Sequence, residues 1–218
     1  MKLYRADIYK PELLCRPINQ SDKIYLARLA LKILADLRVK PKINNKDYDR
    51  HVFDAPQKWQ DEKNNPCLLR QSILRRDLAK YVLNQFGGVE AGEFTCLYSG
   101  EHITLPDREA VRYLAEIDHV VSLSNAWSTG ACNLKLNSRC ELAKDPIELQ
   151  VVSTSSNAAK ANLDASKWLP DNAAYHTQYI ARQIAVKSRY HLWVTKPEHK
   201  AMYKILQEDA SRKDYHSR

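Results

Sequence analysis

The stretch EIDHVVSL, residues 116–123, contains an acid and a histidine side by side within an apolar segment. Because neighbouring residues on a β-strand point to opposite faces, at most one of Asp118 and His119 can face a buried core. Glu116 shares the face of Asp118 if the strand is regular. Such a pair is unfavourable for packing alone, and it indicates a strand that also carries groups for chemistry.

Strand and turn signals lie on both sides of this segment. Residues 94–105 predict a short hairpin that turns at Ser99-Gly100. Residues 147–152 predict a further strand. The hydroxyl residues and alanines that follow, 153–167, predict a turn that enters a short helix. The centre of the chain is therefore expected to be small and rich in β-structure.

Helices are expected on both sides of this centre, because apolar residues recur there at helical spacing. Ser21 would cap the first helix, and Gly87-Gly88 would end the second. The polar stretch 40–66 is rich in turn formers and is expected to be irregular. The predicted helices cover about residues 21–38, 66–86, 172–191 and 197–207. The fold class that follows is α+β, with helical N- and C-terminal flanks.

Composition indicates a globular chain with a basic surface. The chain has 218 residues, 44% of them hydrophobic, and a net charge of +8. No run approaches the roughly 18 apolar residues of a membrane span. The positive charge fits either an inert basic surface or a polyanionic partner such as DNA. Arg70, Arg75 and Arg76 lie on the second predicted helix, where they would form a solvated basic face or contact phosphate.

The five cysteines form no C-x-x-C pair, so a structural zinc site has no support. Disulfides would first be sought between Cys67 and Cys96 or between Cys132 and Cys140.

The N-terminal residues bear on the compartment. Arg5, Asp7 and Lys10 stand where a signal peptide needs an apolar stretch. We therefore expect a cytoplasmic chain, or a secreted or periplasmic one whose leader has been removed.

The acid and the histidine fit the needs of phosphodiester hydrolysis. That reaction requires a base for the attacking water and positive charge near the scissile phosphate. His119 could supply the base, and Asp118 could hold a divalent cation. Asn157, at the entry of the short helix, offers a neutral oxygen suited to a hard cation. Each residue alone has an ordinary alternative: the D-H dipeptide is common, and Asn157 could simply cap a helix.

Together these segments resemble HNH endonucleases of the ββα-metal (His-Me finger) superfamily. The resemblance rests on CLYSGEHI (96–103), EIDHVVSL (116–123) and IELQVVSTSSNAAK (147–160). The wider chain resembles the GmrSD-type HNH family through YDRHVF (48–53), CLLRQSILRRDL (67–78), DPIEL (145–149), WLP (168–170) and IAVKSRY (184–190). This resemblance implies a nuclease domain over residues 45–218 with a ββα core at about 94–170. An N-terminal helical segment, 1–44, would precede it.

Residue roles follow from this resemblance. His119 would be the general base, and Asp118 and Asn157 would hold Mg²⁺ or Mn²⁺. Glu148 stands where the family usually has an asparagine that orients the base. Its carboxylate could accept a hydrogen bond from the imidazole and raise the histidine pKa. Alternatively Glu148 points elsewhere and a backbone carbonyl holds His119.

The resemblance implies an enzyme: a divalent-metal-dependent endonuclease that nicks or cuts DNA without a small-molecule cofactor. Lys160 and Lys187 would join the three arginines as candidate phosphate contacts. The alternative is a catalytically inactive, basic nucleic-acid-binding protein that keeps the HNH fold.

Overall fold

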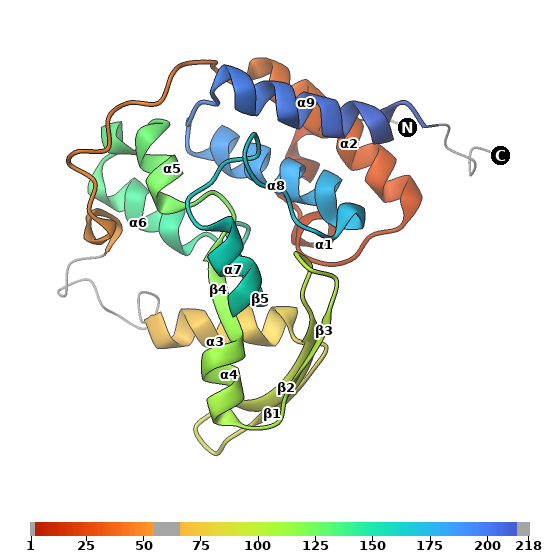
Figure 1. Ribbon diagram of the computed structural model, residues 1–218, viewed down its shortest axis with the longest axis vertical. Coiled ribbons are helices and arrows are strands. Elements are labelled where there is room, and N and C mark those ends of the chain that lie inside the picture. Colours follow the sequence, from red (N-terminus) through yellow and green to blue (C-terminus); the bar gives the residue numbers. More distant parts are fainter. Residues whose placement is uncertain (1–2, 55–65, 213–218) are drawn as a thin grey trace.

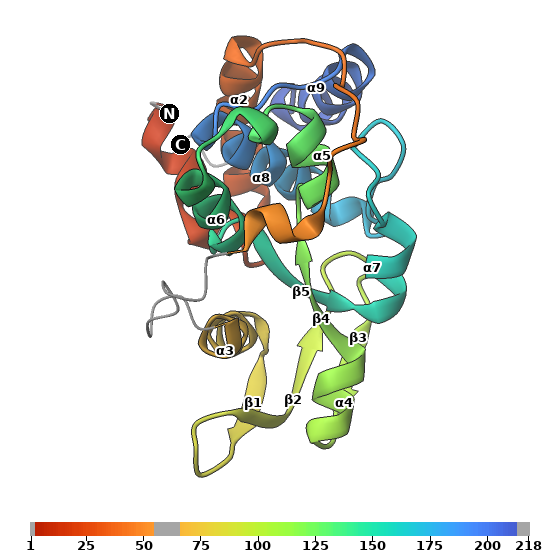
Figure 2. The same ribbon diagram turned by 90° about the vertical axis from the view of Figure 1, so that its left-hand side faces the viewer.

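The computed structural model describes residues 3–54 and 66–212. It shows a mixed α+β fold with helices and two small antiparallel sheets. A group of helices forms one end of the molecule and a three-stranded sheet forms the other, with a two-stranded sheet between them (Figures 1 and 2). The predicted α+β class is confirmed. No helix in the described ranges is long and apolar enough to cross a membrane.

The N-terminal helix belongs to the main core. After η1 (Arg5–Tyr9) and α1 (Pro11–Leu14), helix α2 runs over Gln20–Asp36 and packs against α8 (His176–Arg189) and α9 (Lys196–Ala210). Its cap is Asn19 rather than the expected Ser21, because the Asn19 side chain accepts the Asp22 amide. Helix α9 begins with a capping box between Thr195 and Glu198.

The second predicted helix is too long. Helix α3 spans Pro66–Asp77, and β1 (Lys80–Leu83) then pairs with β2 (Val89–Thr95). The physical reason is the turn between the strands: Asn84 Oδ1 accepts the amides of Phe86 and Gly88, and Gly87 has a φ of 77°. Gly87-Gly88 therefore close a hairpin instead of ending a helix.

The expected hairpin around Ser99-Gly100 is confirmed. Strand β2 pairs antiparallel with β3 (His102–Leu105), which completes the three-stranded sheet. Gly100 has a φ of 81° in the turn.

The two-stranded sheet carries the D-H segment. Helix α4 (Arg108–Leu114) leads directly into β4 (Ala115–His119), which pairs antiparallel with β5 (Leu149–Ser153). The predicted strand 117–123 ends early because Ser122 caps helix α5 (Leu123–Ser128). Between the strands lie η5 (Ala131–Asn133) and α6 (Leu136–Lys144) as well. Helix α7 (Thr154–Lys160) follows β5, as expected, and η6 (Ala173–Tyr175) precedes α8.

Two further expectations concern the connecting segments and the cysteines. Within the irregular stretch 40–66, a short η2 forms at Arg50–Phe53, and residues 55–65 lie outside the described ranges. Cys96, Cys132 and Cys140 are free thiols, so neither proposed disulfide is formed.

Candidate functional site

A pocket of about 450 Å³ lies where β4, β5, α3 and α7 meet. Its wall includes His119, Glu116 and Asn157, together with Arg50 and Arg70. Two of the residues that the sequence selected for chemistry, His119 and Asn157, are thus brought together at one cavity. Among the described residues no group of three or more His, Cys, Asp or Glu side chains could hold a metal ion. Any cation here would rely on few protein ligands.

His119 is fixed by the end of a helix. Its Nε2 lies 3.0 Å from the carbonyl oxygen of Ala143, in the last turn of α6. Carbonyls in the last turn of a helix have no intrahelical partner and are free to accept. Because a carbonyl can only accept, a neutral imidazole must carry its proton on Nε2, and Nδ1 keeps the lone pair. Burial lowers the pKa of His119 to about 4, so the ring is neutral near pH 7.

Glu116 and Asn157 meet across the pocket wall. Asn157 lies in the first helical turns of α7, which starts where the Ser153 side chain accepts the Ser156 amide. Its Nδ2 donates to Glu116 Oε2 at 2.5 Å. The two side chains place a carboxylate and an amide beside His119.

Asp118 faces away from this pocket and is buried. Its Oδ2 accepts from the Tyr98 hydroxyl at 2.7 Å, and its Oδ1 accepts from Lys160 Nζ at 2.9 Å. Lys160 also donates to the carbonyl of His119 at 2.8 Å. Burial and the nearby Asp118 charge raise the pKa of the Tyr98 hydroxyl well above its ordinary value, so it remains a donor. In this arrangement Asp118 joins β4 to α7.

Glu148 does not hold the histidine. It is fully buried, and its Oε2 accepts the Val121 amide at 3.1 Å. Burial raises the pKa of this carboxyl well above its usual range. None of the hydrogen bonds found between described residues joins Glu148 to His119, whose ring bonds to Ala143. Of the two alternatives posed by the sequence, the backbone carbonyl is the one that the structure contains.

The prediction that Lys160 and Lys187 contact phosphate does not fit their positions in the structure. Lys160 and Lys187 are fully buried, and each forms an ion pair with a carboxylate, Lys187 with Glu198 at 2.9 Å. An ammonium group enclosed in this way cannot reach a phosphate. Long basic side chains become buried when they find a carboxylate, and their partners here lie too far along the chain to be seen from the local sequence.

The arginines of α3 divide into three cases. Arg76 pairs with Asp77 and donates to the Leu149 carbonyl at 2.6 Å, so it joins α3 to β5 and is a structural residue. Arg75 is exposed and donates to the Gly87 carbonyl. Arg70 donates to the carbonyls of Val111 and Ala115 and still lines the pocket.

Two pocket residues were not selected from the sequence. Glu116 was noted only as a neighbour of Asp118 on the expected strand face, whereas its side chain reaches Asn157. Arg50 lies inside YDRHVF, a segment that had already carried the resemblance, and this placement was the available signal.

The pocket thus brings together a neutral histidine, a carboxylate, an amide and two arginines. The chain belongs to the family of GmrSD restriction endonuclease C-terminal domains, whose model matches residues 5–205. The match begins before residue 45, where the resemblance began, and so includes the N-terminal helices. This family is nuclease-related, and its restriction-endonuclease character implies DNA as the partner.

A relative from Arthroderma benhamiae bears the name "uncharacterized secreted protein". It is 29% identical over 192 residues, which cover 87% of this chain and 89% of the relative. No solved structure matches this chain.

Proposed function

We propose that this protein is a divalent-metal-dependent endonuclease of the HNH type that hydrolyses phosphodiester bonds of DNA. The observation that carries the proposal is the meeting of His119, Glu116 and Asn157 at one pocket. His119 acts as the base: Nδ1 accepts the proton of the attacking water while Nε2 stays bonded to Ala143. Neutrality near pH 7 is the state that this role requires.

The donor chemistry of the pocket fits a hard divalent cation. Glu116 supplies a carboxylate and Asn157 an amide oxygen, which are the ligand types that Mg²⁺ and Mn²⁺ prefer. Asp118, the ligand expected from the resemblance, fits poorly because both of its oxygens already accept from Tyr98 and Lys160. We therefore assign the cation to Glu116 and Asn157. When bound, such an ion stabilises charge on the scissile phosphate and the leaving oxygen.

The inactive-protein alternative rested on Glu148 at the usual asparagine position. Because Ala143 holds His119, the replacement of that asparagine does not remove the support of the base. Glu148 is accordingly a buried structural residue in this proposal rather than part of the catalytic machinery.

The test is plasmid cleavage by wild type, His119→Ala and the control His102→Ala, with Mg²⁺, Mn²⁺ or EDTA. His102 is an exposed histidine on β3 and should be dispensable. Removal of the base should cost ~10²–10⁴-fold in rate and leave DNA binding intact. Cleavage by His119→Ala within a few-fold of wild type would remove the assignment. Wild type that binds DNA but never cuts it would favour the inactive binding protein.

A binding measurement examines the metal ligands separately. Mn²⁺ titration followed by electron paramagnetic resonance should show weaker binding for Glu116→Gln and Asn157→Ala than for wild type. Unchanged Mn²⁺ affinity in both variants would contradict this ligand assignment.

The relative's name favours the secreted alternative for the compartment over the cytoplasmic one. We propose secretion on that basis, and fractionation of a culture of the source organism would test it.

A further inference from the structure

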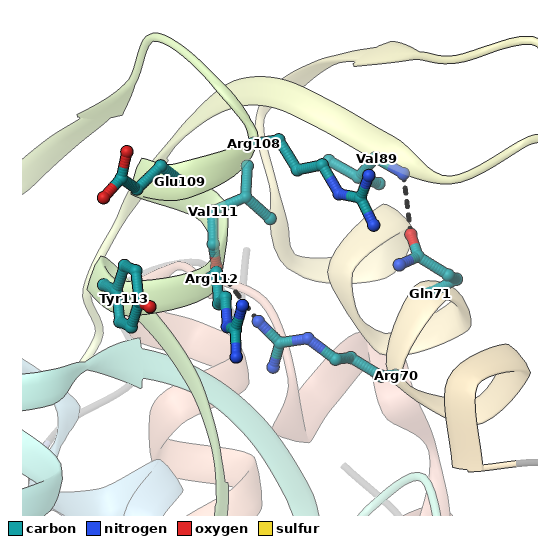
Figure 3. Close-up of a pocket in the computed structure, with 8 residues that line it drawn as sticks. All are labelled: Arg70, Gln71, Val89, Arg108, Glu109, Val111, Arg112 and Tyr113. Carbon is teal, nitrogen blue, oxygen red and sulfur yellow. Dashed lines mark hydrogen bonds between the residues drawn. The ribbon is translucent and has the colours of Figure 1, made fainter.

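A second and larger pocket, of about 750 Å³, lies beside the first, between α3, β2 and α4. Figure 3 shows Arg70, Arg108 and Arg112 around it, and we call this cavity the arginine pocket after these three residues. The guanidinium groups of Arg70 and Arg112 point toward each other, whereas the carboxylate of Glu109 points away from them (Figure 3). Three guanidinium groups therefore make this wall positive, with Glu109 on the same lining and Glu116 close enough to Arg70 to act on its charge.

Salt bridges between described residues do not account for the charges of Arg108 and Arg112. Helix α4 packs through the buried Val111, while Arg108 and Arg112 are exposed on the same face, four residues apart. Like charges at this spacing mildly destabilise a helix. No ion pair found between described residues involves Arg108 or Arg112, and the guanidinium of Arg112 lies 5.3 Å from the ring centre of Tyr113. Arg112 thus gains only the Tyr113 ring and the helix end, and both guanidinium groups remain open to an external anion.

Arg70 connects this pocket to the site of chemistry. It lines both cavities, so the two share a wall. Its Nη2 donates to the carbonyls of Val111 at 3.0 Å and Ala115 at 2.8 Å, at the end of α4. These bonds hold the guanidinium in place at the boundary. Because the two pockets share Arg70, one extended ligand can contact both.

We propose that the arginine pocket binds the phosphate backbone of the DNA strand that flanks the scissile phosphate at His119. This inference rests on the proposed nuclease function and adds the path of the substrate. The guanidinium groups of Arg108 and Arg112 suit the site because each can donate two parallel hydrogen bonds to a phosphate, whereas Arg70, whose Nη2 is bonded to two carbonyls, would contact phosphate through its other nitrogens. The exposed ring of Tyr113 on the same wall would pack beside the backbone.

The test compares two double variants that remove the same charge. In Arg108→Gln/Arg112→Gln the arginine pocket loses two cations. In Lys196→Gln/Lys200→Gln two exposed lysines, also four residues apart, are removed from α9 at the opposite end of the molecule (Figures 1 and 2). Binding of a fluorescein-labelled 30-base-pair duplex is followed by anisotropy in EDTA, at several salt concentrations, after thermal melts confirm folding.

We expect the arginine variant to bind DNA roughly tenfold or more weakly near 0.1 M salt, since charge-assisted hydrogen bonds to phosphate are removed. The slope of log affinity against log salt should flatten by about 0.9 for each phosphate that is no longer neutralised. The lysine variant should stay close to wild type. With Mg²⁺, the arginine variant should show a raised KM and a kcat within a few-fold of wild type.

Equal decreases of affinity in the two double variants would overturn the proposal, because they would indicate a diffuse charge effect. Unchanged affinity in the arginine variant would overturn it as well. Both outcomes are measured by binding in EDTA, so they do not depend on cleavage. If His119→Ala cleaves like wild type, the base assignment fails while the anisotropy result still decides on the arginine pocket.

Discussion

The buried pair between Lys160 and Asp118 makes a quantitative prediction about stability. Lys160 Nζ lies 2.9 Å from Asp118 Oδ1, and the two side chains are 0% and 7% exposed. The change Lys160→Met keeps the aliphatic stem and removes the ammonium, which leaves Asp118 with the Tyr98 hydroxyl as its remaining donor. Leaving a buried charge unpaired costs about 3–5 kcal/mol of unfolding free energy. For a chain of this size that corresponds to a melting temperature lower by roughly 6–20 °C.

The measurement is chemical denaturation at pH 7, with Lys167→Met as the matched control. Lys167 is exposed, so the same substitution there should change stability by less than about 0.5 kcal/mol. If Lys160→Met fails to fold, Asp118→Asn/Lys160→Met serves as the second variant. Removal of both charges should recover much of the stability, because no unpaired charge is then buried.

A phosphate contact would behave differently. It would leave stability nearly unchanged and flatten the salt dependence of DNA binding. If Lys160→Met is as stable as Lys167→Met, the buried pair is refuted.

Two further predictions concern buried groups. Burial raises the pKa of Glu148 well above the ~4.3 of an unfolded glutamate. The folded state therefore keeps a proton that the unfolded state releases, and the stability that this group contributes falls as pH rises above about 5. The Glu148→Gln variant has no charge to bury and still accepts the Val121 amide. Its melting temperature should therefore rise relative to that of wild type between pH 5 and pH 8. A difference that stays constant over this range would contradict the prediction. In the native protein, iodoacetamide should rapidly alkylate only one of the four described thiols, Cys132, which is partly exposed. After denaturation without reductant, all four should react: Cys15, Cys96, Cys132 and Cys140. A Cys132–Cys140 disulfide would instead leave both unlabelled until reduction, as mass spectrometry would show.

The sequence was most informative where local signals agreed. The hairpin at 94–105 and helix α7 were predicted from a Ser99-Gly100 turn and from hydroxyl residues followed by alanines, and strand β5 was expected between them. Tyr81 and Val82 fitted a helical stripe by chance, and pairing with β2 decided their conformation. Helices α4 and α5 span 7 and 6 residues, which is too short for a periodic pattern to be seen.

The candidate site was predictable to a similar degree. His119 and Asn157 were selected by residue type and by the resemblance to HNH endonucleases, and the structure places both at one pocket. The arginine pocket was missed because Arg108 and Arg112 lie on the unrecognised helix α4. Lys187 was misassigned because its burial depends on residues of other elements, such as Asn125, whose Oδ1 lies 2.9 Å from Nζ.

The adjacent acid and histidine of β4 divide their work between the two sides of the strand. Asp118 points into the interior, where it binds Lys160, and His119 lines the pocket. Lys160 lies three residues after Asn157 on α7 and also donates to the backbone carbonyl of His119. The same ammonium group therefore fixes the helix that carries Asn157 against the strand that carries His119. Through Lys160, Asp118 holds β4 against α7, and this contact explains why a buried acid stands beside a histidine that lines the pocket.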